Sequence, residues 1–245
     1  DGKFIAQFGK QYARRSGGTP EKPQYTRGSN DPNSFGRVAK IFVEPKANEA
    51  YISDGYFNTR VAVLDADTGK MKRYWGAYGN KPDDVDMGPY KPDAPPAKQF
   101  RNPVHCADVS NDGFVYVCDR VNDRIQVFTT DGKFVKEGFV AKNTLASGSV
   151  WDVAFSKDRE QRYLFVPDGQ NQRVHILDRQ SLQELATFGD GGHQPGQFFG
   201  AHSIAIDSQG NLYVTETYEG KRVQKFVYKG MGPVTAQTRS TWPAR

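Results

Sequence analysis

The sequence predicts an all-β protein folded as a β-propeller of four-stranded antiparallel blades. Two observations predict it. Four segments align with one another at intervals of about 45–65 residues, and each reads as four short strands joined by turns. The aromatic residues are 12 Tyr and 16 Phe against 3 Met, a composition that favours strands. Short antiparallel strands in repeats of this length are typical of blades around a central channel.

The four repeats follow one another along almost the whole chain. They comprise residues 38–76, 104–139, 150–189 and 201–230. We expect one propeller domain over 1–245, with blades at about 35–79, 100–140, 148–189 and 198–230.

Every repeat has an acid at the end of its second strand and an Arg five or six residues later. An acid there can accept amides of the turn and pair with an Arg that begins the next strand. A catalytic pair would not need to recur in every unit, so we interpret these pairs as structural. They are Asp54 and Arg60, Asp119 and Arg124, Asp168 and Arg173, and Glu216 and Arg222.

The first ten residues, DGKFIAQFGK, resemble DGKFVKEGFV at 131–140, which closes a repeat. Residues 1–10 are therefore expected to be the outer strand of another blade. The favoured full form has six blades, four of them complete here, with the rest upstream of Asp1. In the alternative, this strand completes the last blade of a four-bladed ring, because GPVTAQTRSTWPAR offers no convincing fourth strand. Polar segments rich in Pro and Gly separate the units, at 11–34, 80–99 and 190–197.

Composition narrows the function classes. The net charge is +5, from 33 Lys and Arg against 28 Asp and Glu, and the two signs alternate along the chain. No basic stripe is visible, so nucleic-acid binding is disfavoured, and no apolar run reaches the roughly 18–20 residues of a membrane span. An N-terminal Asp in place of Met fits a processed, extracytoplasmic protein. Cys106 and Cys118 are too few for a disulfide framework or a cysteine zinc site.

The candidate site comes from one position per repeat, in the strand that lines the channel. Counted back from the strand-end acids, this position holds Ala39, His105, Trp151 and His202. Both histidines precede their acid by 14 residues (119 − 105 and 216 − 202) and lie two blades apart. Imidazole is the commonest transition-metal ligand, so the pair predicts a channel metal site. The alternative is that both only donate and accept hydrogen bonds. His175 and His193 lie off this register and are expected to be ordinary.

The stretch DGFVYVCDRVNDRIQVF (112–128) closely resembles the NHL repeat. A narrower resemblance covers AYISDGYFNTRV (50–61), PVHCADVSNDGFVYVCDRVNDRIQVF (103–128) and AHSIAIDSQGNLYVTE (201–216). These segments look like parts of the peptidyl-α-hydroxyglycine α-amidating lyases. That family is a six-bladed NHL-type propeller whose channel zinc is held by three histidines. It cleaves the N–Cα bond of a C-terminal α-hydroxyglycine and gives a peptide amide and glyoxylate.

The resemblance assigns roles to four residues of this chain. His105 and His202 match the second and third zinc histidines, Tyr56 the catalytic Tyr, and Arg120 an active-site Arg. It implies zinc or another divalent transition metal as Lewis acid, Tyr56 as base, and Arg120 as anchor of a carboxylate or of developing charge. Alternatively, Tyr56 only packs over the channel mouth, and Arg120 pairs with Asp119.

The sequence also departs from the family. Phe57 replaces a cysteine that forms a disulfide in the animal lyases, and Ser203 replaces an acid that helps to hold a structural calcium, so a calcium site is not expected. The first zinc histidine and another Arg have no counterpart and are expected upstream. The partner is then a small molecule or a peptide C-terminus. The rival function is a non-enzymatic propeller that binds a protein through residues 80–99; an RNA-binding NHL domain is less favoured because the charge is scattered.

Overall fold

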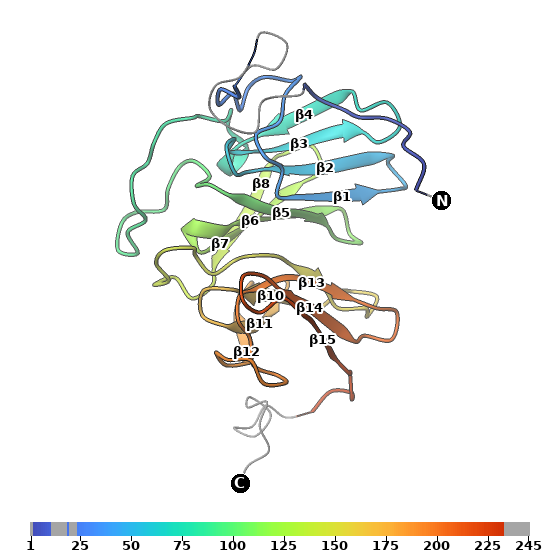
Figure 1. Cartoon of the computed structure of the whole chain (residues 1–245), viewed down its shortest axis with the longest axis vertical. Coiled ribbons are helices and arrows are strands. Elements are labelled where there is room, and N and C mark those ends of the chain that lie inside the picture. The colour runs from blue at the N-terminus through green and yellow to red at the C-terminus, as the bar shows by residue number, and fades with distance from the viewer. Residues whose placement is uncertain (1, 11–18, 20–23, 233–245) are drawn as a thin grey trace.

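Four antiparallel sheets follow one another along the chain in the computed structural model, which describes residues 2–10, 19 and 24–232 (Figure 1). The first blade contains β1 (Lys40–Glu44), β2 (Glu49–Asp54), β3 (Arg60–Asp65) and β4 (Met71–Trp75). The second contains β5 (Val104–Val109), β6 (Phe114–Asp119), β7 (Arg124–Thr129) and β8 (Phe134–Phe139). The third contains β9 (Ala154–Phe155), β10 (Tyr163–Asp168), β11 (Arg173–Asp178) and β12 (Glu184–Phe188), and the fourth β13 (Ala201–Ile206), β14 (Leu212–Glu216) and β15 (Val223–Phe226).

The prediction of an all-β propeller of antiparallel blades is confirmed, and the described residues contain just two short 3-10 turns, η1 (Ala77–Gly79) and η2 (Arg120–Asn122). Two details differ. The fourth blade has three strands in the described part of the chain, and the segment predicted to lack a fourth strand falls mostly in 233–245, outside it. Residues 80–99 and 190–197 lie between blades, as predicted, whereas most of 11–23 lies outside the described residues.

The outer strand predicted at residues 1–10 does not appear among the nine described residues, 2–10, and its place in a preceding blade stays a prediction. They pair with no strand of the described structure, and Gly2 and Gly9 near their two ends have φ values of +71° and +89°. Instead, Phe8 packs where a Cβ on Gly69 would lie, against the first blade. The segment therefore does not complete the fourth blade, which lies at the other end of the molecule (Figure 1).

Three of the four predicted acid–arginine pairs form. Arg60 Nε lies 2.9 Å from Asp54, Arg124 Nε 2.7 Å from Asp119, and Arg222 Nε 2.6 Å from Glu216. The first two pairs are fully buried. All three pairs occupy the same position of their blade, where they join the end of its second strand to the start of its third strand.

The pair predicted in the third blade is wrong. Arg173 Nε donates to the carbonyl of Asn171. Asp168 contacts His175 Nε2 at 3.1 Å instead, and His175 Nδ1 lies 2.7 Å from Glu184. His175, two residues after Arg173 on β11, replaces Arg173 as the partner of Asp168. We therefore interpret His175 as a structural residue, as expected for a histidine off the channel register.

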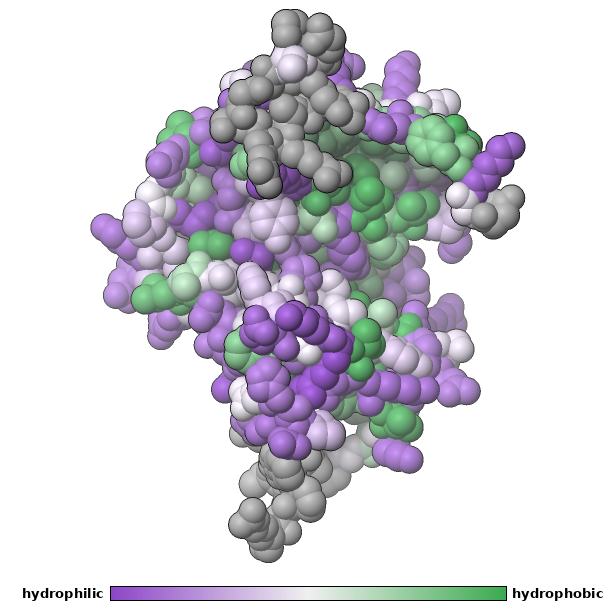
Figure 2. Space-filling model, in the orientation of Figure 1, coloured by the Kyte–Doolittle hydropathy of each residue, from purple (hydrophilic) through white to green (hydrophobic). Residues whose placement is uncertain are grey.

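Apolar clusters fill the spaces between successive blades. One cluster joins Tyr51, Val61 and Val63 of the first blade to the second, another joins the second to the third, and another the third to the fourth. The other face of the first blade stays uncovered by any blade in the described structure, and Figure 2 shows apolar side chains there. They include Val38, Ile41 and Val43, which are 36%, 57% and 52% exposed.

The two cysteines form a disulfide, which the sequence did not predict. Cys106 on β5 and Cys118 on β6 lie directly opposite each other, with Cα atoms 4.8 Å apart, and both are fully buried. The bridge stands one residue after His105 and two before Arg120, so it fixes the two strands that present these side chains.

Candidate active site at the channel

Tyr56 is brought against the second blade by a glycine. Gly55 follows β2 and lies so close to β5 that a Cβ on it would be 2.0 Å from the carbonyl oxygen of Val104. Only glycine permits that approach. The next residue therefore reaches His105, and the Tyr56 hydroxyl lies 3.1 Å from His105 Nε2.

The hydrogen bonds of His105 define its tautomer. Its Nδ1 contacts the backbone carbonyl oxygen of Trp151, which can only accept, so Nδ1 carries the proton. Nε2 of the neutral ring then has a lone pair and accepts from the Tyr56 hydroxyl. His105 is 4% exposed, and burial, with the nearby Arg120 charge, lowers its pKa to about 3. The ring is thus neutral at physiological pH, as a metal ligand or a proton acceptor must be.

His202 lies beside His105, as the shared register predicted. The two ring centroids are 4.8 Å apart, and the Trp151 ring lies 5.3 Å from His202 and 5.9 Å from His105. His202 Nδ1 is 3.0 Å from the Ser203 hydroxyl, which leaves Nε2 available. Burial lowers the pKa of His202 as well.

Arg120 completes the group without the acidic partner that the alternative assigned to it. Asp119 pairs with Arg124 instead, and Arg120 has no ion pair to a carboxylate in the described structure. Its guanidinium stacks over Trp151 at 4.4 Å, and Nη1 lies 3.5 Å from the Tyr56 hydroxyl. Its Nε is buried without a hydrogen-bond partner. Such a group is suited to binding an anion, because burying an unpaired charge is costly.

A close backbone contact positions Arg120 and Trp151 together. A Cβ on Gly148, which has φ +72°, would lie 2.0 Å from the carbonyl oxygen of Arg120. The Trp151 indole N–H donates to the Gly148 carbonyl at 2.7 Å. The turn before the third blade thus holds the indole under the guanidinium.

The two histidines fit part of a metal site. Their ring centroids lie 4.8 Å apart, and the backbone contact of His105 Nδ1 is the support that a metal-binding imidazole usually has. Among the described residues, however, no group of three or more His, Cys, Asp or Glu side chains is arranged around a common point. His105 and His202 would therefore be two ligands of an open coordination sphere.

A second ionic group lines the channel next to the histidines, and the sequence analysis missed it. Lys40 Nζ lies 2.7 Å from Asp108 and 2.5 Å from Asp152. The other Asp152 oxygen accepts from the Ile204 amide at 3.1 Å. The group joins the inner strands of all four blades.

A countable signal could have found Lys40. The 14-residue spacing that selects both histidines leads back from Asp54 to Lys40 (54 − 40), not to the Ala39 of our alignment. Lys40 is therefore the channel residue of the first blade. No comparable signal marks Asp108 or Asp152.

Comparisons with known proteins agree with the sequence resemblance. The NHL repeat model matches residues 200–226. Peptidyl-glycine alpha-amidating monooxygenase of Mus musculus is 34% identical over 109 residues, 44% of this chain, and the Rattus norvegicus protein matches equally. The aligned region is 10% of those relatives' length. The chain thus contains an NHL repeat and is similar over part of its length to this amidating enzyme.

Solved structures share the fold at low sequence identity. Hydrazine synthase of Kuenenia stuttgartiensis superimposes with a TM-score of 0.54 at 16% identity, over 82% of this chain and 49% of that one. The Cps50 (Swd1) β-propeller domain of Myceliophteria thermophila gives 0.52 at 12%, over 78% and 54%. Virginiamycin B lyase from Staphylococcus aureus gives 0.50 at 16%, over 78% and 56%. The chain therefore spans about half the length of each of these chains. The described residues contain no helix long and apolar enough to cross a membrane.

Proposed function

We propose that this propeller is a metal-dependent lyase that cleaves the N–Cα bond of a C-terminal α-hydroxyglycine or a closely related carboxylated substrate. The observation that carries the proposal is the contact of Tyr56 with both His105 and Arg120, at 3.1 and 3.5 Å. Similarity to the amidating enzyme supports it. A buried and a half-buried neutral imidazole, beside a guanidinium that forms no ion pair in the described structure, are suited to such a reaction.

The residues have distinct roles in this proposal. Arg120 binds the substrate carboxylate, since its guanidinium is buried and lacks an acidic partner. In its phenolate form, Tyr56 removes the proton of the substrate hydroxyl and later returns it, and the positive charge of Arg120 stabilises the negative charge on these oxygens. The electron pair of the hydroxyl oxygen forms the C=O bond of glyoxylate as the C–N bond breaks. The amide nitrogen takes up the proton, and a peptide amide leaves.

His105 and His202 would hold zinc or another divalent transition metal. When bound, this ion supplies Lewis acidity to an oxygen of the substrate. His105 keeps its proton on Nδ1 through the Trp151 carbonyl, so its lone pair is on Nε2, where it accepts from Tyr56 and would bind the ion instead. The Trp151 ring packs edge-on against both imidazoles, with centroid distances of 5.9 and 5.3 Å.

We also propose an extracytoplasmic location. The buried Cys106–Cys118 disulfide supports this, because disulfides persist in oxidising compartments and are rare in the cytosol.

The test is glyoxylate release from a synthetic peptide that ends in α-hydroxyglycine, with metal content measured on the same protein. We expect release that depends on added zinc and falls at least about 100-fold in Tyr56→Phe, a loss typical of general acid–base groups. His105→Ala with His202→Ala should also lose the bound metal. The matched control is His193→Ala, whose ring stacks on Phe199 away from the channel. A protein that binds no transition metal and releases no glyoxylate would favour the interaction propeller.

A further inference from the structure

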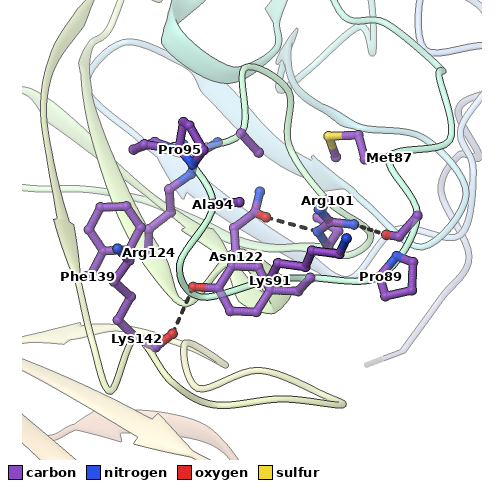
Figure 3. Close-up of a pocket in the computed structure, with 14 residues that line it drawn as sticks. Met87, Pro89, Lys91, Ala94, Pro95, Arg101, Asn122, Arg124, Phe139 and Lys142 are labelled. Atoms are coloured by element: carbon purple, nitrogen blue, oxygen red, sulfur yellow. Dashed lines mark hydrogen bonds between the residues drawn. The ribbon is translucent and has the colours of Figure 1, made fainter.

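Two cavities open next to the candidate site and share a wall. The larger, of about 620 Å³, is lined by Arg120 together with Arg101 and the segment 87–90. The smaller, of about 350 Å³, is lined by the same segment and Arg101 from the other side (Figure 3). A chain that extends from Arg120 through the larger cavity therefore reaches the smaller one.

The smaller cavity is cationic. Its charged lining residues are Lys91, Arg101, Arg124 and Lys142, and none of its 14 lining residues is an Asp or Glu. Arg124 is already neutralised by Asp119 and Glu137. Asp86 is the one acid among the residues that line the larger cavity, and Asp119 accepts from the Arg101 amide.

The remaining three cations lack acidic partners. Lys91 and Lys142 are exposed and form no ion pair within the described structure. Arg101 donates to the Asn122 side-chain oxygen at 3.0 Å and to the Gly88 carbonyl, which are both neutral (Figure 3). Three positive charges thus border one hollow with no negative charge in its wall.

The hollow is held in shape by the loop that forms it. The Tyr90 hydroxyl donates to the Lys142 carbonyl at 2.8 Å, which ties the 80–99 loop to the segment after β8. The Arg101 amide donates to Asp119 at 3.0 Å. A site that exists before its ligand arrives loses less entropy on binding.

We propose that this cavity binds the carboxylate of an acidic side chain in a peptide whose C-terminal residue lies at Arg120. The proposal rests on the function proposed above and names its substrate class: peptides with a Glu or Asp upstream of the C-terminus. The planar N–H groups of Arg101 suit a carboxylate, and Lys91 and Lys142 add charge. The walls formed by Pro89, Pro95 and Phe139 suit the methylene groups of a Glu side chain.

The experiment measures binding without turnover. Fluorescent peptides that end in glycine, and so lack the reactive hydroxyl, carry a single Glu, Gln or Lys scanned over the residues before the C-terminus. We expect one or two Glu positions to bind about tenfold more tightly than Gln, as for a charge-assisted hydrogen bond. The double variant Lys91→Glu with Lys142→Glu should abolish that preference. The control, Lys157→Glu with Lys229→Glu, changes the net charge equally at exposed lysines outside the cavity.

The outcomes separate this inference from the proposed function. Equal affinity for Glu and Gln peptides at every position would overturn the inference, even if α-hydroxyglycine peptides release glyoxylate. A Glu preference that is lost in the double variant supports the cavity, even if no glyoxylate is ever formed. Tighter binding of a single-stranded RNA oligomer, lost in the same variant, would overturn the choice of a peptide.

Discussion

Lys40→Met tests how far the channel ion group stabilises the fold. The variant keeps much of the side-chain volume but removes the ammonium that lies 2.7 Å from Asp108 and 2.5 Å from Asp152. Asp108 and Asp152 are 7% and 2% exposed, and one oxygen of Asp108 already lacks a partner. Burial already raises the pKa of Asp108 to about 6, even with Lys40 beside it.

The expected loss follows from this burial. Removal of one partner from a buried ion pair costs about 3–5 kcal/mol. The Lys40 side chain is 27% exposed, so water partly screens the group, and we expect a loss of about 3 kcal/mol. Adding Asp108→Asn and Asp152→Asn should recover much of it, since no uncompensated charge then remains.

Urea unfolding followed by tryptophan fluorescence measures this loss as a lower midpoint. The control is Lys72→Met, which removes a similar contact of 2.6 Å to Glu49 from a more exposed lysine. It should cost less than about 1 kcal/mol. If Lys40→Met and Lys72→Met destabilise the protein equally, the channel group does not act as a buried ion pair.

Three further predictions concern other buried groups. Burial raises the pKa of Asp123 to about 8, so the folded protein keeps a proton that the unfolded chain releases above about pH 4. The free energy of unfolding should therefore fall by up to about 1.4 kcal/mol per pH unit as pH rises toward 8. In urea titrations at several pH values, Asp123→Asn should remove this slope, and an unchanged slope would contradict the raised pKa of Asp123. Gly55→Ala should destabilise the protein by at least about 2 kcal/mol, because the Cβ of the alanine would lie 2.0 Å from the carbonyl oxygen of Val104. A variant with wild-type thermal stability would refute that contact. Arg124→Met should lower the free energy of unfolding by about 3–5 kcal/mol, as for a buried pair. Arg173→Met breaks no such pair and should cost less than half of that. Equal losses in thermal unfolding would refute the assignment of His175 as the partner of Asp168.

The spacing of repeated residues predicted which side chains of the candidate site lie together. A constant count from the strand-end acids placed His105 and His202 at one level of the channel, and the structure has their rings 4.8 Å apart. Tyr56 and Arg120 came from the family resemblance, and their side chains meet at 3.5 Å. Because each repeat folds into the same blade, residues at the same position of the repeat lie at the same level of the channel. Their proximity could therefore be predicted from the sequence.

Residues outside the repeat pattern could not be placed in this way. The contact of Asp168 with His175 replaces that with Arg173 because side chains two residues apart on β11 point to the same face and compete for one carboxylate. The sequence pattern alone does not decide that competition. Likewise, Asp152 reaches Lys40 across 112 residues, and only the curvature of the blades brings them together.

The buried disulfide has a consequence for the kinetics of unfolding. Cys106 and Cys118 are fully covered by the packing of the second blade against the third, so a reducing agent can attack the bond only after those blades separate. The rate of reduction in native buffer should therefore report how often this interface opens. Because the bond joins strands next to each other in sequence, it can form before the later blades have packed. In the finished propeller, the packing of the second blade against the third shields the bond from exchange.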